Sequence, residues 1–199
     1  KKKTVTDRFG NKSTRAITGT ITALTDLDIN GDFLLDGGSF IAPANIYIAG
    51  DWTNLVSAAA FEEGTNNVTF DGTTDQNCNG ETFYHLTLDK SAGRIIIGSN
   101  DVHCTSYDHQ DGGVRVDGPV FYAADLADNG IYGEIELVNG TIEWHQGTSS
   151  GEYVDLCGDL TISGGTMNIY GGADNSYWPY LTDASLTMSQ GSLDFKSVG

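Results

Sequence analysis

The chain has 199 residues, a formal net charge of −17 and 39% hydrophobic residues. This length suffices for one domain with a sizeable core, and the hydrophobic content is too high for a disordered chain. A surface of this sign repels phosphate backbones and anionic lipids, so we expect no nucleic acid partner. No apolar run is long enough to span a bilayer, so we expect no membrane insertion.

Residues 1–23 are polar and rich in threonine, which predicts an extended N-terminal arm or cap. Apolar and threonine residues alternate near its end, as in a β-strand. This part of the arm either covers its own first coil or adds a strand to a neighbouring copy. The candidate self-assembly residues are Ile17, Thr18, Thr20 and Ile21.

From residue 24 to residue 199, apolar residues recur in pairs spaced i, i+2, the period of a strand with one buried face. The pairs begin 18 to 28 residues apart, at Leu27, Ile46, Val68, Leu86, Val114, Ile135, Leu160 and Leu186. This pattern predicts one all-β domain, a right-handed parallel β-helix or β-solenoid with coils of about 18–28 residues. The alternative is an antiparallel β-sandwich, which also has short strands between frequent turns.

An internal repeat favours the solenoid. Residues 27–42 match residues 154–169 at a constant shift of 127 residues, with apolar pairs and glycine-containing bends in the same order. Three strands joined by bends describe one coil of a solenoid. The domain is complete in itself or is a fragment or subunit of a longer assembly.

Two segments interrupt the apolar pattern, residues 100–113 and 171–183, and we interpret both as loops that project from the scaffold. The second contains an aromatic group that is a candidate ligand contact, because exposed rings stack on sugars. Alternatively, the rings cover a flank of the solenoid. The candidate residues are Tyr177, Trp178 and Tyr180.

The wording of residues 45–98 resembles the repeat regions of large secreted surface proteins of Bacteroidetes and related bacteria. The residues that carry this resemblance are Gly50-Asp51-Trp52-Thr53-Asn54, Val68-Thr69-Phe70-Asp71-Gly72-Thr73 and Thr82-Phe83-Tyr84-His85-Leu86-Thr87-Leu88-Asp89-Lys90. The resemblance implies a right-handed parallel β-solenoid and an extracellular, surface-associated location. It implies no catalytic residue.

Signals for catalysis and for cofactors are weak. Pectin-degrading β-helices gather carboxylates with Arg or Lys, and this chain has only Lys90, Arg94, Arg115 and Lys196 beyond its arm. His103, Cys104 and His109 lack zinc-ligand spacing, and adjacent residues of a strand face opposite sides. Aspartate-rich bends leave a Ca²⁺ site as an alternative to no cofactor. The spacing of Cys78, Cys104 and Cys157 leaves a disulfide undecided.

We therefore expect a non-enzymatic, extracellular β-solenoid that serves as a structural or adhesin-like surface module. Its expected partners are copies of itself, as in a head-to-tail filament, or neighbouring domains of a surface assembly. The alternative is a β-helix that binds or degrades polysaccharide.

Overall fold

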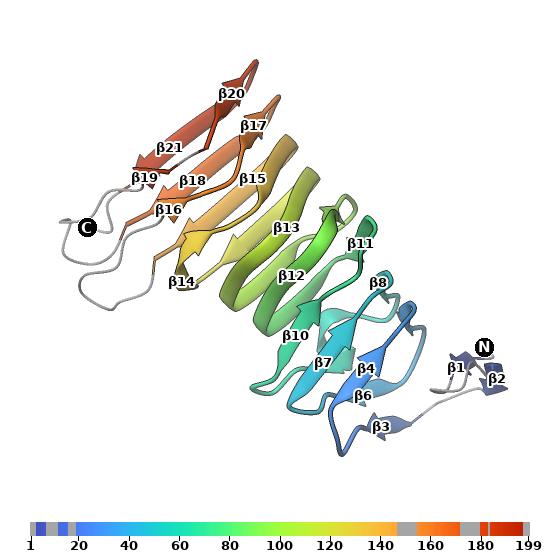
Figure 1. Cartoon of the computed structure of the whole chain (residues 1–199). Helices are drawn as coiled ribbons and strands as arrows, with labels where there is room; N and C mark the ends of the chain where they lie inside the picture. Colours follow the sequence, from blue (N-terminus) through green and yellow to red (C-terminus); the bar gives the residue numbers. More distant parts are fainter. Residues whose placement is uncertain are drawn as a thin grey trace.

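Short strands separated by bends wind into a parallel β-solenoid of about seven turns (Figure 1). This computed structural model describes residues 3–6, 12–15, 19–146, 155–171, 180–182 and 184–196. Every strand pairing within the solenoid is parallel. The predicted solenoid is confirmed, and the alternative of an antiparallel sandwich is wrong. Only β1 (Lys3–Thr6) and β2 (Lys12–Arg15) pair antiparallel, in a separate sheet.

Each turn of the solenoid contributes strands to three faces. Face 1 contains β4 (Leu27–Ile29), β7 (Asn45–Ile48), β10 (Asn67–Phe70), the middle of β12 (Glu81–Ile97), part of β13 (Val102–Ala123), β14 (Leu126–Ile131), β16 (Asp155–Leu156) and β19 (Tyr180–Leu181). Face 2 contains β5 (Phe33–Leu35), β8 (Trp52–Asn54), β11 (Gln76–Asn79), parts of β12 and β13, the start of β15 (Glu134–His145), β17 (Leu160–Ile162) and β20 (Leu186–Met188).

Face 3 begins within the segment predicted to be an arm. It contains β3 (Thr20–Thr22), β6 (Ser39–Ile41), β9 (Phe61–Glu62), the starts of β12 and β13, the ends of β13 and β15, β18 (Thr166–Tyr170) and β21 (Ser192–Lys196). Thr20 and Ile21 pair with Ser39 and Phe40, so they lie in the first coil of their own chain. A single short 3₁₀ helix, η1 (Ala58–Ala60), precedes β9 in the described residues.

The structure places the two halves of the 127-residue repeat on corresponding faces. Leu27 and Leu156 lie on face 1, Phe33 and Leu160 on face 2, and residues 40 and 167 on face 3. A constant shift over three strands therefore reports the same path round the coil, as the sequence predicted.

The predicted series of leading apolar residues joins two different ladders. Leu27, Ile46, Val68 and Leu86 are in register on face 1, but the next residue of that ladder is Tyr107, not Val114. The later members begin a ladder on face 2, which runs Ile95, Val114, Ile135, Leu160 and Leu186. The apparent interval of 28 residues was thus a change of face rather than a long coil.

The same error produced the predicted loop at residues 100–113, which is wrong. These residues lie at the end of one bend and in β13, where Val102, Cys104, Tyr107 and His109 are buried. They alternate with exposed polar residues at the strand period. A tyrosine and a histidine occupy inward positions in place of aliphatic residues, which hid the pattern.

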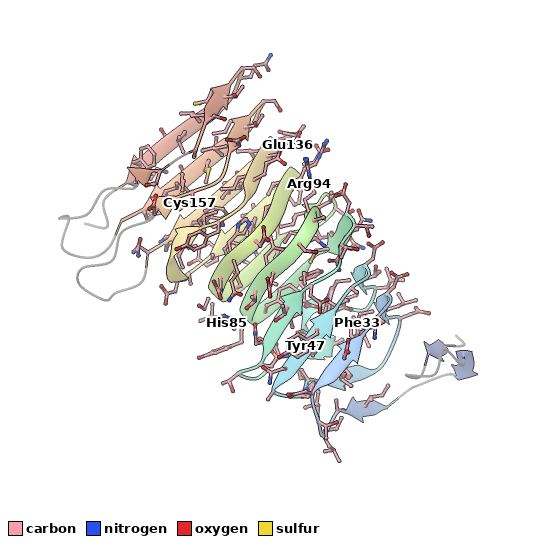
Figure 2. The ribbon with its side chains drawn as sticks, in the orientation of Figure 1. Phe33, Tyr47, His85, Arg94, Glu136 and Cys157 are labelled. Carbon is pink, nitrogen blue, oxygen red and sulfur yellow. The ribbon has the colours of Figure 1, made fainter. Side chains whose placement is uncertain are left out.

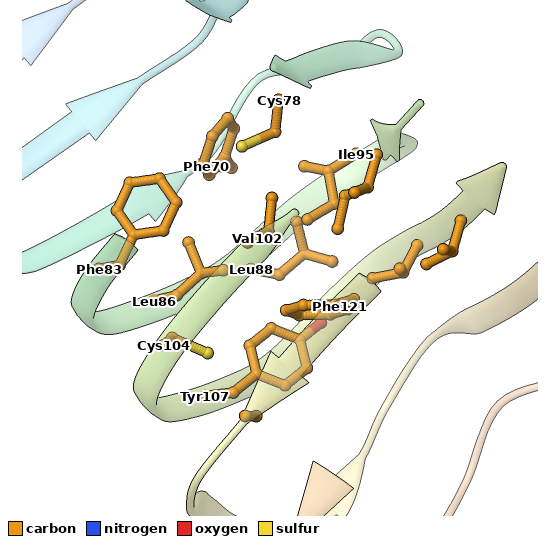
Figure 3. Close-up of a cluster of buried hydrophobic side chains, with 14 of the residues drawn as sticks. Phe70, Cys78, Phe83, Leu86, Leu88, Ile95, Val102, Cys104, Tyr107 and Phe121 are labelled. Carbon is orange, nitrogen blue, oxygen red and sulfur yellow. The ribbon is translucent and has the colours of Figure 1, made fainter. Parts of the chain in front are cut away.

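The core is a continuous column of apolar side chains inside the three faces, shown in part in Figure 3. Aromatic rings stabilise it at two levels. Trp52 stacks on Phe33 with ring centroids 4.1 Å apart and meets Phe61 edge-on at 4.9 Å. Farther along, Phe121 meets Tyr107 edge-on at 5.0 Å and Trp144 at 5.7 Å. These geometries add to the stabilisation from burial alone.

One cation lies inside the solenoid. Lys90 is fully buried, and its Nζ donates hydrogen bonds to the carbonyl oxygens of Gly72 (2.7 Å) and Thr74 (3.0 Å) and to Oε1 of Gln76. Gln76 Nε2 in turn donates to the carbonyls of Ile48 and Gly50. Burial lowers the pKa of Lys90 to about 8. The lysine thus satisfies carbonyl groups of the preceding bend, which a buried chain must pair.

Aspartates at the bends join each coil to the next. A side-chain oxygen of the earlier coil accepts a hydrogen bond from a backbone N–H one coil later, and we call these bonds aspartate clamps. The six clamps among the described residues are Asp26–Asn45 (3.1 Å), Asp32–Asp51 (3.0 Å), Asp51–Asn77 (2.7 Å), Asp75–Arg94 (3.1 Å), Asp101–Val120 (2.9 Å) and Asp159–Ser185 (3.0 Å). Charge-assisted bonds of this kind are stronger than neutral ones. They account for part of the acidic composition.

The facing of β17 gives a direct test of the core. Replacing the buried Ile162 by lysine places an unpaired charge in the ladder, so we expect loss of cooperative folding. The neighbouring Thr161 is in register with Glu136, and Thr161→Lys should change the free energy of unfolding by less than about 0.5 kcal/mol. Circular dichroism with urea titration measures both. Equal effects would show that the assigned facing is wrong.

The buried lysine gives a second test. Lys90→Met keeps the aliphatic stem but leaves its three acceptors unpaired, so we expect a loss of about 3 kcal/mol in the free energy of unfolding. Lys196→Met, on the exposed last strand, is the control and should cost less than about 0.5 kcal/mol. Urea unfolding of both variants checks the difference, and a silent Lys90→Met would contradict the assigned role.

Candidate functional site

Most residues that the sequence singled out do not form a site in the part of the chain that the structure describes. Tyr177, Trp178, Ile17 and Thr18 lie outside the described residues. Tyr180 begins β19, where it pairs with Asp155. Thr20 and Ile21 form β3, and Thr20 Oγ1 lies 2.8 Å from Ser39 Oγ in the adjacent strand. Self-assembly through the arm therefore stays a prediction.

The histidines and cysteines have separate positions. His103 is exposed whereas Cys104 is buried, as expected for neighbours on a strand. His109 lies inside the solenoid, where its Nδ1 is 3.0 Å from Tyr107 Oη and its Nε2 is 3.1 Å from the Gly112 carbonyl oxygen. Burial lowers the pKa of His109 to about 4, so it is a neutral structural side chain at pH 7.

All three cysteines are free thiols. Burial raises the pKa of Cys78 and of Cys104 well above the ordinary value, which keeps both protonated. Within the described ranges, no group of three or more His, Cys, Asp and Glu side chains is placed to hold a metal ion. The aspartates of the segment predicted to resemble a calcium loop, Asp26 and Asp32, form clamps to the next coil.

A groove lies at the corner between face 2 and face 3, where the chain leaves β8 and returns through η1. Its volume is about 520 Å³. Residues of three successive coils line it: Asn54, Leu55, Val56, Ser57, Ala58, Asn79, Gly80, Glu81, Thr82, Asn100, Asp101 and His103. Gly80 has a φ of +67°, and a Cβ there would lie 2.3 Å from Asn100 Cβ. The close approach of these two coils therefore requires glycine.

The groove contains a buried carboxyl group that the sequence analysis missed. Glu81 is only 2% exposed. Its Oε2 accepts hydrogen bonds from Asn54 Nδ2 (2.8 Å) and Trp52 Nε1 (3.3 Å), and its Oε1 accepts one from the backbone N–H of Thr82 (3.0 Å). Burial raises the pKa of Glu81 to about 7 in spite of these donors. A glutamate next to a bend glycine gives no sequence signal of such burial.

Asn54 links this carboxyl group to the wall of the groove. Its Nδ2 also donates to the Ser57 carbonyl oxygen at 2.7 Å, and its Oδ1 accepts from the backbone N–H of Val56 at 3.0 Å. Across the groove, Asn100 Nδ2 donates to Asn79 Oδ1 at 3.0 Å. The irregular segment 54–58 is thus held in place by side chains rather than by strand pairing, and its shape is defined before any ligand binds.

A row of rings follows face 3 from the edge of the groove. The centroid of His103 is 5.6 Å from that of Tyr122, and His145 lies 5.2 Å from Tyr122. His145 stacks on Tyr170 at 4.1 Å with an interplanar angle of 3°. Lys196 Nζ lies 5.3 Å from the Tyr170 ring. The faces of His145 and Tyr170 cover each other, so this row stabilises the sheet more than it offers flat surfaces for stacking.

The other cations beyond the arm also have partners within the protein. Arg94 pairs with Glu134 at 3.1 Å and with Glu136, and Arg115 pairs with Glu136 at 3.5 Å and with Asp117 at 3.2 Å. Figure 2 shows Arg94 and Glu136 together on one side of the solenoid. With Lys90 buried as well, the described solenoid has little positive charge left for an anionic ligand.

The last described coil leaves apolar side chains uncovered. Leu186 and Met188 occupy the inward positions of β20, in register with the buried Leu160 and Ile162, yet they are 43% and 44% exposed. Phe195 of β21 is 45% exposed for the same reason. These residues form an apolar surface at the end of the described solenoid, which we call the open end.

Comparisons of the chain with models of known protein families, with curated proteins and with solved structures found no match. In the ranges that the structure describes, no helix is long and apolar enough to cross a membrane.

The raised pKa of Glu81 predicts a pH dependence of stability. The ordinary pKa is 4.5 and the folded-state value is about 7, so the folded chain holds this proton more tightly than the unfolded chain. The resulting stabilisation is fully present below pH 4.5 and is lost as the pH rises through 7. Relative to Glu81→Gln, we expect the free energy of unfolding of the wild type to fall by about 3 kcal/mol over this range.

Urea unfolding at a series of pH values measures this difference. The indole N–H of Trp52 gives an independent measurement, because it donates to the same carboxyl group. Its NMR resonance, assigned with Trp52→Phe, should titrate near pH 7 in the wild type and not in Glu81→Gln. A stability difference that does not change with pH, or an indole resonance that does not titrate, would refute the assignment.

Proposed function

We propose that this chain is a non-enzymatic structural module of an extracellular, surface-associated protein, and that its solenoid stacks end to end with a second copy. The extracellular part of the proposal comes from the resemblance of residues 45–98 to repeats of secreted surface proteins. The stacking part comes from one observation, which is that the inward side chains of the last described coil are exposed.

A parallel solenoid suits a structural role because its stabilising contacts repeat along one axis. Each strand hydrogen-bonds to the strands of the coils before and after it, and apolar ladders follow the same axis. Stability then increases with each added coil, and neighbouring coils depend mainly on each other. The aspartate clamps strengthen the corners, where the backbone changes direction. The result is a rod that resists bending between its faces.

A second copy fits the open end because the two ends of the described solenoid present the same three faces. The first coil offers β4, β5 and β3 on faces 1, 2 and 3, and the last coil offers β19, β20 and β21 on the same faces. Strands at an open sheet edge carry unpaired N–H and C=O groups, which pair readily with another strand. Residues 27–40 also repeat the pattern of an internal coil. A head-to-tail contact of this kind propagates into a filament.

Substitutions on β20 test this proposal. Leu186→Lys combined with Met188→Lys puts two charges into the stacking surface, and we expect these changes to abolish end-to-end oligomers. Thr187→Lys is the matched control, because residue 187 lies between them and belongs to the outer side of the same strand. Sedimentation velocity over a range of concentrations measures association, and electron micrographs show whether the oligomers are linear.

A wild-type protein that stays monomeric at about 1 mM would overturn the stacking proposal, as would a loss of association in Thr187→Lys alone. Deleting residues 1–18 separates the arm from the stacking surface, since this truncation keeps β3 and the first coil intact. Oligomers that persist after the deletion support stacking of the coils, and oligomers that vanish only after it assign assembly to the arm.

A further inference from the structure

We propose that the groove between residues 54–58 and the bend at residues 79–82 binds a neutral carbohydrate. This binding site is separate from the open end and does not depend on the structural role proposed above. Three observations lead to it: the shape of the groove, the unusual position of Glu81, and the distribution of charge on the described solenoid.

The groove is a departure from the regular coil. Elsewhere the corners of the solenoid are short bends, but here the chain leaves β8, exposes Leu55 (60%) and Val56 (44%), and re-enters the sheet only at β9. Exposing two large apolar residues costs stability that a short bend would retain. Together with the polar wall of the groove, they make an amphipathic cleft of about 520 Å³. Small-molecule sites are commonly concave, with apolar contacts and a few placed polar groups.

Glu81 occupies a position where an apolar residue would stabilise the core more simply. Its neighbour in register on the next coil is Val102, which is fully buried, and Glu81 itself is buried to the same degree. A buried carboxyl group without a cation is costly. No ion pair involving Glu81 occurs in the ranges that the structure describes. A local rule broken without a structural gain is typical of a functional position.

The side chains around the groove suit hydroxyl groups. Carboxyl oxygens of Glu81 and Asp101 accept hydrogen bonds, the carboxamides of Asn79 and Asn100 both donate and accept, and His103 adds an exposed imidazole. A sugar hydroxyl both donates and accepts, so it can use each of these groups. The apolar side chains of Leu55 and Val56 lie where the C–H face of a sugar ring requires contact.

Charge decides between ligand classes. A net charge of −17 and two carboxyl groups in the groove repel an acidic polysaccharide or a nucleic acid. Lys90, Arg94 and Arg115, the cations that remain within the solenoid, are engaged with protein groups. A metal ion is disfavoured because the described side chains offer no cluster of three or more ligands. A neutral, hydroxyl-rich ligand remains the class that fits.

The experiment uses the full chain and four neutral probes: cellohexaose, xylohexaose, mannohexaose and maltohexaose. Binding is measured by isothermal titration calorimetry and by the NMR shift of the Trp52 indole N–H, which contacts Glu81 directly. We expect at least one probe to bind the wild type and to shift this resonance. Filling the groove with Ala58→Trp should weaken that binding by at least about tenfold.

Ala59→Trp is the matched control, because Ala59 is exposed and adjacent but does not line the groove. It should bind the probe as the wild type does, and equal urea midpoints of the two variants show that both are folded. The proposal is overturned if no probe binds at about 10 mM, or if Ala58→Trp binds as well as Ala59→Trp. Binding retained when Leu186 and Met188 are both replaced by lysine separates this site from end-to-end stacking.

Discussion

Hydrogen bonding between successive coils is the constraint on which this structure depends. A strand of a parallel solenoid finds no partner within its own coil, so its N–H and C=O groups must pair with the coils on either side. Register is therefore conserved along each face, whereas the bends vary in length. The aspartate clamps extend this pairing to the corners, where the backbone turns away from strand geometry. In every clamp the carboxylate belongs to the earlier coil, so much of the negative charge has a structural use.

The interior obeys the same economy, because the buried polar side chains near its centre are paired. Lys90 neutralises the carbonyl groups of a bend, and His109 lies between a tyrosine hydroxyl and a carbonyl oxygen. Both stabilise the path of the chain and point to no ligand. Glu81 differs because its carboxyl group is buried beside a groove and takes up a proton near neutral pH. The same low-dielectric surroundings thus produce two structural groups and one group suited to binding.

The two proposals concern different parts of one scaffold. Stacking at the open end uses the repetition of the coils, since any coil with the same three faces is a suitable neighbour. Carbohydrate binding uses the place where repetition fails, the excursion between β8 and β9. A solenoid accommodates such an excursion because the faces on either side keep their register and hold both ends of the inserted segment. A structural rod that also holds polysaccharide would combine both properties in a surface layer.

The sequence alone determined the architecture, because strand period and bend residues are local properties. The 127-residue repeat assigned three strands to the correct faces, and Trp52 and Trp144 were correctly expected in the core. Only the tertiary structure decided which coil follows which: Tyr107 and His109 fill inward positions that look polar in sequence, and this concealed the coil between Leu86 and Val114. Glu81 was equally hidden, since its burial depends on Trp52, Asn54 and the Gly80 bend, which come together only when coils stack. Periodicity is written within a coil, but the contacts that build a site are made between coils.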